Sequence, residues 1–320
     1  EKPDPTKTVD SHSQAPFGTG AWLLAACERV RYMDALAEAE PLTIEVTNNS
    51  GEMRREVVEL SAADVFAKMK TQGGRQFVIL DKSGMEQPYQ LTRDGKVLMS
   101  VAVRPWSTVA FTVKRGEPRF YKTAVYGKHW PNREDDLAWE TDRAAWRAYG
   151  PKVEQKKQHL YGMDVFVKNT PEPMLETFYG NELHMYGLQA PLWKAALNDA
   201  AVALQKVWSY HYNHGQGMDD YAVGPTLGAG APALANGDKW LLPKPWNECK
   251  IIENGPIRFV AQTTHVHDND SSLIEHRTLT AERGSHLTRI DVRYEGKLVK
   301  ELPNVVSGVV VHKSAPDNYR

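Results

Sequence analysis

Apolar and polar residues alternate with a period of two in the first third of the chain, which is the pattern of half-buried β-strands. Residues 42–46 and 56–60 alternate in this way, and the turn-forming residues 48–51 separate them. Further apolar runs, bounded by Gly, Pro, Asp and Lys, lie at residues 77–80, 97–103 and 109–113. We predict that residues 41–115 form a small antiparallel sheet module.

Helical periodicity appears at two places. Ser61 is expected to cap a short helix over residues 65–69, and the longest helical signal covers residues 192–206. Alternation returns in the C-terminal part, at residues 257–266, 272–279, 287–294 and 305–311. One face of these strands is apolar and the other polar, so one packs on a core and the other meets water or a ligand. The chain is therefore predicted to be mainly β, an antiparallel β-sandwich with a few helices.

Residues 1–20 contain Pro, Gly and Ser but no periodic apolar pattern, and we predict a flexible leader over residues 1–40. Residues 24–27 read Leu-Ala-Ala-Cys, as in a lipoprotein cleavage box, but the residues before them are polar and lack a basic region. A buried cysteine in a short helix is favoured instead. Residues 41–320 are predicted to form a single domain, with residues 116–320 as its motif-bearing core.

Composition narrows the class of protein. The 320 residues are 41% hydrophobic and 25% charged, which is ordinary for a globular chain and excludes collagen-like and coiled-coil classes. The 39 Lys and Arg residues balance 40 Asp and Glu, so no overall field favours nucleic acid or an anionic membrane surface. No apolar run approaches the roughly 18 residues that span a bilayer. GxGxxG, P-loop and GxSxG motifs are absent, so nucleotide binding and serine-hydrolase chemistry have no support.

Residues 133–150 concentrate three Arg, five acidic residues, two Trp and one Tyr. A solvated charged face is the plain interpretation. Trp139 and Tyr149 would be poorly placed in water, however, so part of the segment is predicted to be buried with its charges paired. A buried Arg beside aromatic rings suits bidentate recognition of a carboxylate.

Residues 210–230 combine five glycines with acid–base side chains. Glycine lets the backbone approach a ligand, and the loop's candidate acid–base residues are His211, His214, Asp219 and Tyr221. Core histidines around a structural glycine turn are the alternative.

The spacing of two histidines is compatible with a metal site. His211 and His214 could ligate a divalent metal ion if Asp219 or another carboxylate completes the set, although no HExxH motif is present. His265 and His267 would share one face of a strand, and we leave them outside the site because exposed strand histidines are commoner than ligands.

Five motifs carry a family resemblance. They are R-x-D-D-x-A-W-E-x-D-R at residues 133–143, R-x-Y-G-P at 147–151, G-M-D-V-F-V-K at 162–168, Y-H-x-x-H-G-x-G-x-D-x-Y-x-V-G-x-T-L-G-x-G at 210–230 and N-G-P-I-R at 254–258. In these motifs the chain resembles the bacterial family catalogued as domain of unknown function 4861, over roughly residues 42–312. The resemblance implies a galactose-mutarotase-like β-supersandwich and a place in gene clusters that degrade acidic plant and algal polysaccharides, such as ulvan or pectin.

Relatives in that setting resemble oligosaccharide dehydratases or lyases, which leave a 4,5-unsaturated uronic acid at the non-reducing end. The chain departs from the family pattern at Thr141, where Asn is expected, and at Gln216, where Glu is usual. Relatives also continue beyond the position of Arg320 with further strands, which leaves the completeness of the sandwich open.

Elimination from a uronic acid requires a cation for the C6 carboxylate, a base for the C5 proton and an acid for the departing O4. Arg143 or Arg147 suits the first role. The base and acid candidates are His214 and Tyr221, with His211 and Asp219 to orient or tune them. The other predicted sugar-contacting residues are Trp139, Glu140, Tyr149, Trp208 and Tyr212.

Two other classes stay open. A hydrolase, epimerase or mutarotase could use the same sandwich, with Glu140 and Asp219 as a carboxylate pair. A non-catalytic carbohydrate-binding protein would not need His214 or Tyr221. The expected partner is an acidic oligosaccharide, and the only cofactor considered is a divalent metal ion. The family placement favours a periplasmic or secreted location, with the cytoplasm as the alternative, and would permit a Cys27–Cys249 disulfide.

Overall fold

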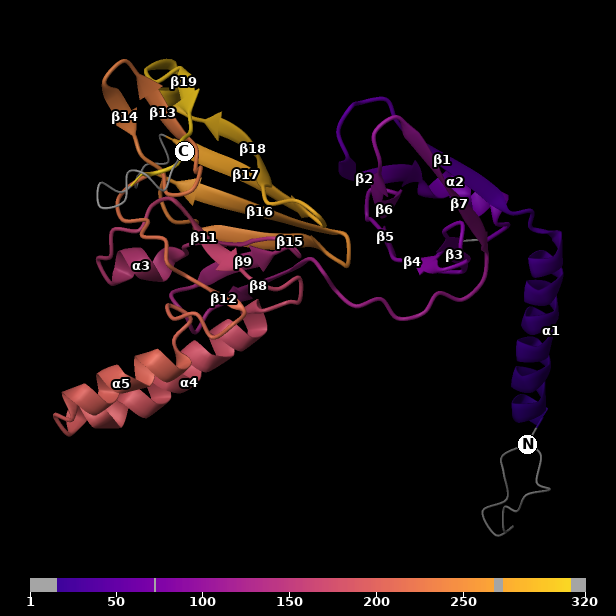
Figure 1. Cartoon of the computed structure of the whole chain (residues 1–320), viewed down its shortest axis with the longest axis horizontal. Helices are drawn as coiled ribbons and strands as arrows, with labels where there is room; N and C mark the ends of the chain where they lie inside the picture. Colours follow the sequence, from indigo (N-terminus) through magenta and orange to yellow (C-terminus); the bar gives the residue numbers. More distant parts are fainter. Residues whose placement is uncertain (1–15, 72, 268–272, 312–320) are drawn as a thin grey trace, which may run out of the picture. The chain divides into compact units, whose positions relative to one another are not determined.

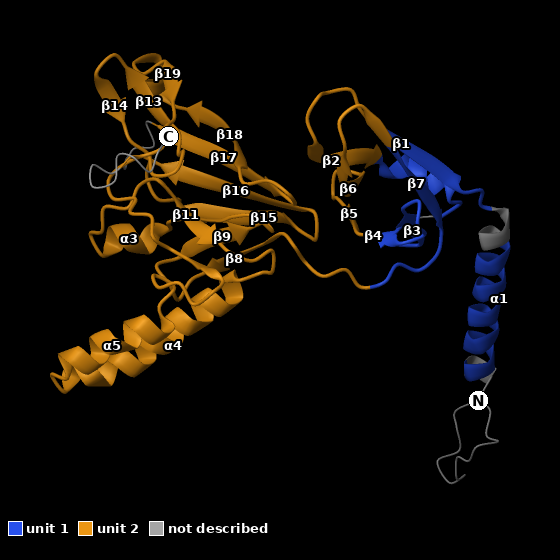
Figure 2. Ribbon diagram, viewed as in Figure 1, with its two compact units in different colours: residues 1–46, 61–87, 109–119 blue, residues 47–60, 88–108, 120–320 orange. Residues whose placement is uncertain are grey.

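The computed structural model describes residues 16–71, 73–267 and 273–311. It divides into two compact units, shown in Figures 1 and 2. The first unit comprises residues 1–46, 61–87 and 109–119, and the second comprises residues 47–60, 88–108 and 120–320. The predicted sheet module over residues 41–115 therefore contributes strands to both units.

The first unit contains a four-stranded sheet in the order β1–β7–β3–β4. Its strands are β1 (Leu42–Asn48), β3 (Phe77–Leu80), β4 (Glu86–Gln87) and β7 (Ser107–Arg115). Helix α2 (Ala62–Lys68) begins at Ser61, whose side chain accepts a hydrogen bond from the N–H of Asp64 as predicted. The short helix and its cap were therefore readable from the sequence.

Helix α1 (Pro16–Glu38) precedes this sheet, so the prediction of a flexible leader is wrong over these residues. Helix-forming Ala and Leu follow Gly20 without further Gly or Pro, which allows the helix to continue. Cys27 is exposed on α1 and not buried as expected, and both it and Cys249 are free. Within the described ranges, no helix is both long enough and apolar enough to cross a bilayer.

The second unit is a β-sandwich with further elements. Its first sheet has the order β12–β11–β10–β9–β8 and its second the order β15–β16–β17–β18. The first sheet consists of β8 (Tyr126–Trp130), β9 (Asp136–Glu140), β10 (Ala145–Ala148), β11 (Met163–Lys168) and β12 (Gly217–Met218). The second consists of β15 (Glu248–Asn254), β16 (Arg258–Val266), β17 (Ile274–Glu282) and β18 (Thr288–Glu295). Pairing within both sheets is antiparallel.

The core of the sandwich lies between these two sheets. Trp139 and Trp146 of the first sheet pack with Phe259 and Leu279 of the second, and the Trp139 and Phe259 rings are stacked 6.2 Å apart. Gly127 on β8 makes this contact possible, because a Cβ there would meet the Phe259 ring at 2.3 Å. The prediction of a mainly β, antiparallel sandwich with a few helices is confirmed.

Two smaller sheets complete the strands of the second unit. One has the order β2–β6–β5, from β2 (Arg54–Ser61), β5 (Tyr89–Leu91) and β6 (Lys96–Val103). The other has the order β14–β13–β19, from β13 (Ala233–Asn236), β14 (Lys239–Leu241) and β19 (Asn304–Val306). The strand predicted over residues 305–311 is thus limited to β19, with η1 (Lys297–Lys300) before it and an isolated bridge from Val309 to Ala229 after it.

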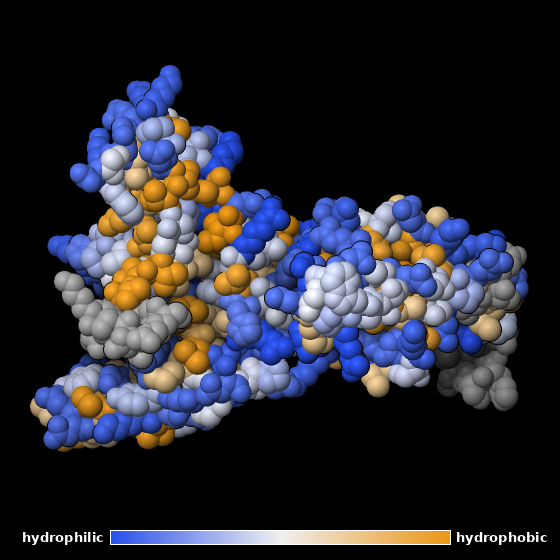
Figure 3. Space-filling model, turned by 45° about the horizontal axis from the view of Figure 1, so that its top comes forward, coloured by the Kyte–Doolittle hydropathy of each residue, from blue (hydrophilic) through white to orange (hydrophobic). Residues whose placement is uncertain are grey.

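Helices cover the outer face of the first sheet. Helix α3 (Pro151–Gln155) follows β10, and α4 (Leu175–Lys194) and α5 (Asn198–Trp208) form a hairpin (Figure 1). Phe178 and Tyr179 of α4 pack on Phe166 of β11. The hairpin surface is mostly hydrophilic with separate apolar patches (Figure 3). Its exposed large apolar side chains include Trp193 and Val207.

The prediction of one helix over residues 192–206 is wrong. The chain reverses at residues 195–197, where Ala196 has a positive φ of 56° and ends the helical hydrogen bonding. The preceding part of α4, residues 175–191, was not predicted, because it mixes Gly, Thr and Tyr with apolar residues and gives only a weak helical pattern.

The inner face of the second sheet holds a buried polar cluster. His265 is 1% exposed, with Nδ1 2.7 Å from the Lys244 carbonyl and Nε2 2.9 Å from Thr263 Oγ1. His267 bonds Glu275 at 3.0 Å, and Arg277 bonds the other oxygen of that carboxylate. His265 and His267 do share a face, as predicted, but the expectation that they are exposed is wrong.

Burial, with the charge of Arg277, lowers the pKa of His265 to about 3 from its usual 6.5. The unfolded chain therefore binds a proton at His265 between these two pH values, so stability is lost as pH falls below about 6.5. We expect the free energy of unfolding to be about 2 kcal/mol lower at pH 5 than at pH 7 through this residue. Urea unfolding of wild type and His265→Gln at both pH values measures it. An equal drop in both proteins would contradict the assignment.

Candidate functional site

The helix-covered face of the first sheet carries buried charges on three adjacent strands. Alternation along the strands places on this one face Asp136 and Glu140 of β9, Arg147 of β10, and Asp164 and Lys168 of β11. The carboxylates are fully buried, Arg147 is 3% exposed, and the Lys168 side chain is buried. Buried charges are costly unless they are paired. The prediction that residues 133–150 are partly buried with paired charges is confirmed.

Arg147 is the centre of this arrangement. Its Nη2 donates to Asp219 Oδ2 at 2.8 Å and to Asp164 Oδ2, and Nη1 donates to Tyr210 Oη at 2.9 Å. Tyr149 Oη lies 3.1 Å from Nη2 and donates to the same Asp164 oxygen at 3.0 Å. The terminal nitrogens are thus committed to the protein's own carboxylates and tyrosines. Arg147 is not placed to bind a substrate carboxylate, and we assign it a positioning role.

His211 is the exposed end of the same network. Its Nδ1 lies 2.9 Å from the backbone carbonyl of Asp219 and 3.6 Å from Asp219 Oδ2. A carbonyl can only accept, so Nδ1 carries the proton of the neutral imidazole and Nε2 keeps its lone pair. The side chain is 50% exposed, whereas that of Asp219 is 2% exposed. Asp219, whose carboxylate is fixed by Arg147, therefore orients the half-exposed imidazole through its backbone carbonyl, and its carboxylate lies 3.6 Å from the same nitrogen.

Glycine makes this placement possible. Gly217 on β12 has a φ of 127°, and a Cβ there would meet the Val167 carbonyl oxygen at 2.0 Å. Only glycine lets β12 approach β11 this closely. The approach brings Asp219, two residues later, to the Arg147 side chain that Asp164 of β11 also contacts.

The other predicted acid–base residues lie elsewhere on the loop. His214 is exposed, and its Nε2 lies 3.0 Å from the Ser209 carbonyl. Tyr221 Oη donates to the Val310 carbonyl at 3.2 Å and accepts from the Val310 N–H at 3.1 Å. His214, like His211, is thus bonded to a backbone carbonyl, and His211 differs in having the Asp219 carboxylate 3.6 Å away. Across the described part of the chain, no three His, Cys, Asp or Glu side chains are grouped to hold a metal ion.

Three predicted sugar-contacting residues have other partners, and a fourth adjoins His211. Trp139 is fully buried in the sandwich core, where its indole N–H donates to Thr288 Oγ1 at 2.8 Å, so its assignment as a sugar wall is wrong. Trp208 packs edge-on against His184 at 4.9 Å. Arg143 lies in the β9–β10 turn, beside Asp142 at 3.5 Å. Tyr212 follows His211 and is 41% exposed.

Glu140 is also structural, and its predicted contact with sugar is wrong. It is fully buried, accepts hydrogen bonds from the N–H groups of Met174 and Leu175 at the start of α4, and pairs with Lys168 Nζ at 2.6 Å. A carboxylate at a helix N-terminus satisfies otherwise unpaired N–H groups. Glu140 therefore anchors α4 to the sheet.

Glu140→Ala is expected to lower the free energy of unfolding by about 3–5 kcal/mol, because it strands the Lys168 ammonium in the interior. The double variant Glu140→Met with Lys168→Met should recover much of this loss. Urea unfolding measures both. A loss below about 1 kcal/mol in the single variant would contradict a structural role.

Sequence reasoning missed Asp136 and Asp164. Asp136 accepts a hydrogen bond from Tyr179 Oη at 3.0 Å and lies 3.7 Å from Arg147. Burial raises the pKa of Asp136 to about 6 despite Arg147 and Arg133, and burial also raises the pKa of Asp164. The signal was present in the sequence, because each acid stands next to apolar residues in a short, mostly apolar strand.

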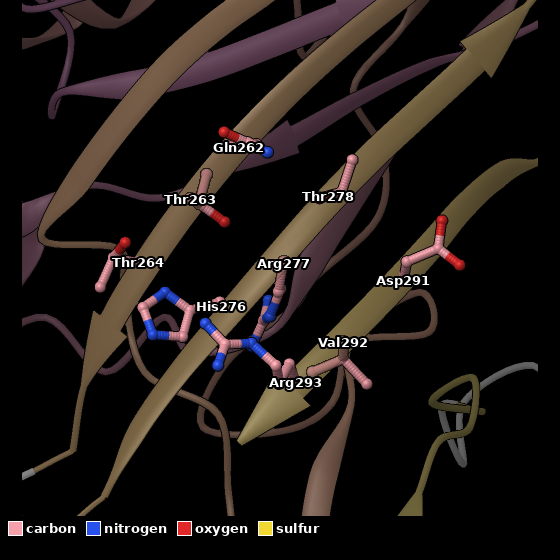
Figure 4. A pocket seen from close by; sticks show the side chains of 9 residues that line it. All are labelled: Gln262, Thr263, Thr264, His276, Arg277, Thr278, Asp291, Val292 and Arg293. Carbon is pink, nitrogen blue, oxygen red and sulfur yellow. The ribbon is translucent and has the colours of Figure 1, made fainter. Parts of the chain in front are cut away.

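A separate polar pocket of about 400 Å³ lies on the outer face of the second sheet (Figure 4). Its labelled side chains include Thr264, His276 and Arg293. His276 Nε2 lies 3.5 Å from Glu295, but that carboxylate is 46% exposed, so water weakens the pairing. The imidazole of His276 is therefore less firmly held than that of His211.

With the geometry described, the chain can be compared with known proteins. The model of the family described as domain of unknown function (DUF4861) matches residues 46–320. The chain belongs to this family. This confirms the resemblance seen in the sequence motifs, and the buried network of Arg147, Asp164, His211 and Asp219 lies inside the matched residues of the DUF4861 chain.

One curated relative and two solved structures are also similar to the DUF4861 chain. A curated relative, the uncharacterized protein P7 of Formosa agariphila, is 24% identical over 180 residues, which are 53% of this chain and 40% of that protein. A glycosyl hydrolase family 38 protein of Enterococcus faecalis aligns over 85% of this chain and 34% of its own, with 9% identity and a TM-score of 0.40. An alpha-mannosidase of E. faecalis V583 aligns over 85% and 32%, with 11% identity and a TM-score of 0.34. At these TM-scores the likeness defines neither fold nor activity.

Proposed function

We propose that this DUF4861 chain is a carbohydrate-active lyase or dehydratase that uses His211 as its base on a uronic acid at the end of an acidic oligosaccharide. One observation carries the proposal: the backbone carbonyl of Asp219, whose carboxylate is held by Arg147, fixes Nδ1 of the half-exposed His211 imidazole and leaves Nε2 as the nitrogen with the lone pair. Histidine titrates near neutral pH, which suits it to proton transfer. The class of sugar comes from the family resemblance.

The reaction is a β-elimination. His211 Nε2 takes the C5 proton, the C–H electrons form the C4=C5 double bond, and the C4–O4 bond breaks. The departing oxygen takes up the proton that His211 acquired and leaves as water in a dehydratase or as a sugar hydroxyl in a lyase. Asp219 and Arg147 act through His211, because the buried carboxylate stabilises the imidazolium that forms.

The hydrolase alternative has less support from these residues. Paired-carboxylate hydrolysis needs two acids that reach the glycosidic bond. Glu140 is fully buried and occupied by Lys168 and α4, and Asp219 is 2% exposed and occupied by Arg147. The candidate pair therefore lacks access to substrate, which favours chemistry through histidine.

Product analysis tests the proposal. The protein is incubated with oligosaccharides ending in glucuronic, iduronic or galacturonic acid, followed by ultraviolet absorbance and mass spectrometry. Growth of the enol-ether absorbance, with loss of water or release of the sugar that was linked through O4, is expected. New reducing ends without that absorbance would establish hydrolysis instead. Absence of any product across the panel would overturn the proposal.

A further inference from the structure

One cation beside His211 is not committed to the buried network. Arg133 lies in the turn between β8 and β9, and its side chain is 13% exposed. Its Nη1 is 3.8 Å from Asp136 Oδ2, beyond hydrogen-bonding distance. Its buried Nε has no partner among the residues that the structure describes. Over the same described residues, the Nε of Arg147 is likewise without a partner, but its terminal nitrogens are hydrogen-bonded to Tyr210, Asp164 and Asp219, whereas Arg133 has only the longer contact with Asp136.

Two aromatic rings flank this guanidinium, and one of them also lies against His211. The Cζ atom of Arg133 lies 5.9 Å from the ring centres of both Tyr186 and Tyr210. The Tyr210 ring is in turn 4.8 Å from that of His211. Arg133 and His211 thus contact the same tyrosine, and the half-exposed Tyr186 flanks the guanidinium on α4.

We infer that Arg133, between Tyr186 and Tyr210, binds the carboxylate of an acidic sugar beside His211. This inference rests on the proposed function, and it replaces Arg147 and Arg143 in the role that sequence reasoning gave them. A free guanidinium presents planar paired donors that match a carboxylate, and the tyrosine rings fix its plane. The C5 proton is α to that carboxylate, so a sugar held there offers this proton to a neighbouring base.

The charges around Arg133 are compatible with an anionic ligand. Asp164 and Asp219 are directed at Arg147, and Asp136 lies between the two arginines at 3.7 and 3.8 Å. Burial raises the pKa values of Asp136 and Asp164. Arg133 is the cation of the cluster that reaches the surface.

Binding of matched sugars tests the inference without requiring turnover. D-Galacturonic acid and D-galactose, and D-glucuronic acid and D-glucose, differ only in the carboxylate at C6. We expect wild type to bind each acid about 10–100-fold more tightly than its neutral counterpart. Arg133→Gln should abolish this preference and leave the affinity for the neutral sugar unchanged, while Arg133→Lys should retain part of it. Dissociation constants from NMR titration provide the measurement.

The matched control is Arg289→Gln, which removes a 75% exposed arginine on β18 and should keep the full preference. Loss of the preference in Arg143→Gln, its persistence in Arg133→Gln, or its absence from wild type would overturn the inference. Circular dichroism establishes that each variant is folded. If the preference for the acidic sugar depends on Arg133 but the turnover assay yields no enol-ether product, the carboxylate subsite is supported and elimination is refuted. If wild type forms the enol-ether product and Arg133→Gln still prefers the acidic sugars, the carboxylate subsite is refuted and the proposed elimination stands.

Discussion

Replacing His211 with alanine is expected to lower kcat on a uronic-acid oligosaccharide by a factor of about 10²–10⁴, with little change in folding stability. The variant loses the group that accepts the C5 proton. Its stability should change little because the imidazole is half exposed and bonded only through Nδ1. Initial rates of enol-ether formation and a urea unfolding curve give the two quantities.

Two histidine variants sharpen this result. His276→Ala removes the imidazole from the polar pocket of Figure 4 and should leave kcat unchanged. His214→Ala tests the base that sequence reasoning favoured, on the same loop. Full activity in His211→Ala, combined with a large loss in His276→Ala, would move the active site to the outer face of the second sheet.

Replacing Arg147 with methionine is expected to lower the free energy of unfolding by about 3–5 kcal/mol at pH 7. The substitution preserves most of the apolar volume but leaves Asp164, Asp219 and Asp136 buried without their shared cation. The loss should diminish as pH falls toward 5, since protonation neutralises the stranded carboxylates.

The control is Arg289→Met, which breaks an ion pair of 75% and 52% exposed side chains and should cost less than about 1 kcal/mol. Urea unfolding at pH 7 and pH 5 compares the variants. An Arg147→Met protein as stable as wild type would show that the network does not support the fold.

Many of the strands could be predicted from the alternation of apolar and polar residues. The strands around residues 42–46 and 257–266 were predicted because each has one buried face. Helix α4 could not be read in the same way, because its contact with the sheet depends on Glu140 and Lys168, which come from distant strands. Local sequence gives no sign of such a tertiary contact.

The candidate site, too, was predicted from the sequence only in part. The motifs named His211, Asp219, Arg147 and Tyr149, which the structure brings together. The roles were misassigned, because spacing cannot reveal that Arg147 is already occupied or that Trp139 faces the sandwich core. Partners such as Asp164 become visible only when the register of β10 against β11 is known.

The long separation between Arg147 and Asp219 has a consequence for folding. These residues are 72 positions apart, and the chain between them includes β11 and the whole α4–α5 hairpin. Closing so large a loop carries an entropic cost that is repaid only once the contact forms. The sheet can therefore assemble before the loop carrying His211 docks, and catalytic competence should emerge after most secondary structure. In a refolding experiment, recovery of activity would then lag behind recovery of the far-ultraviolet circular dichroism signal.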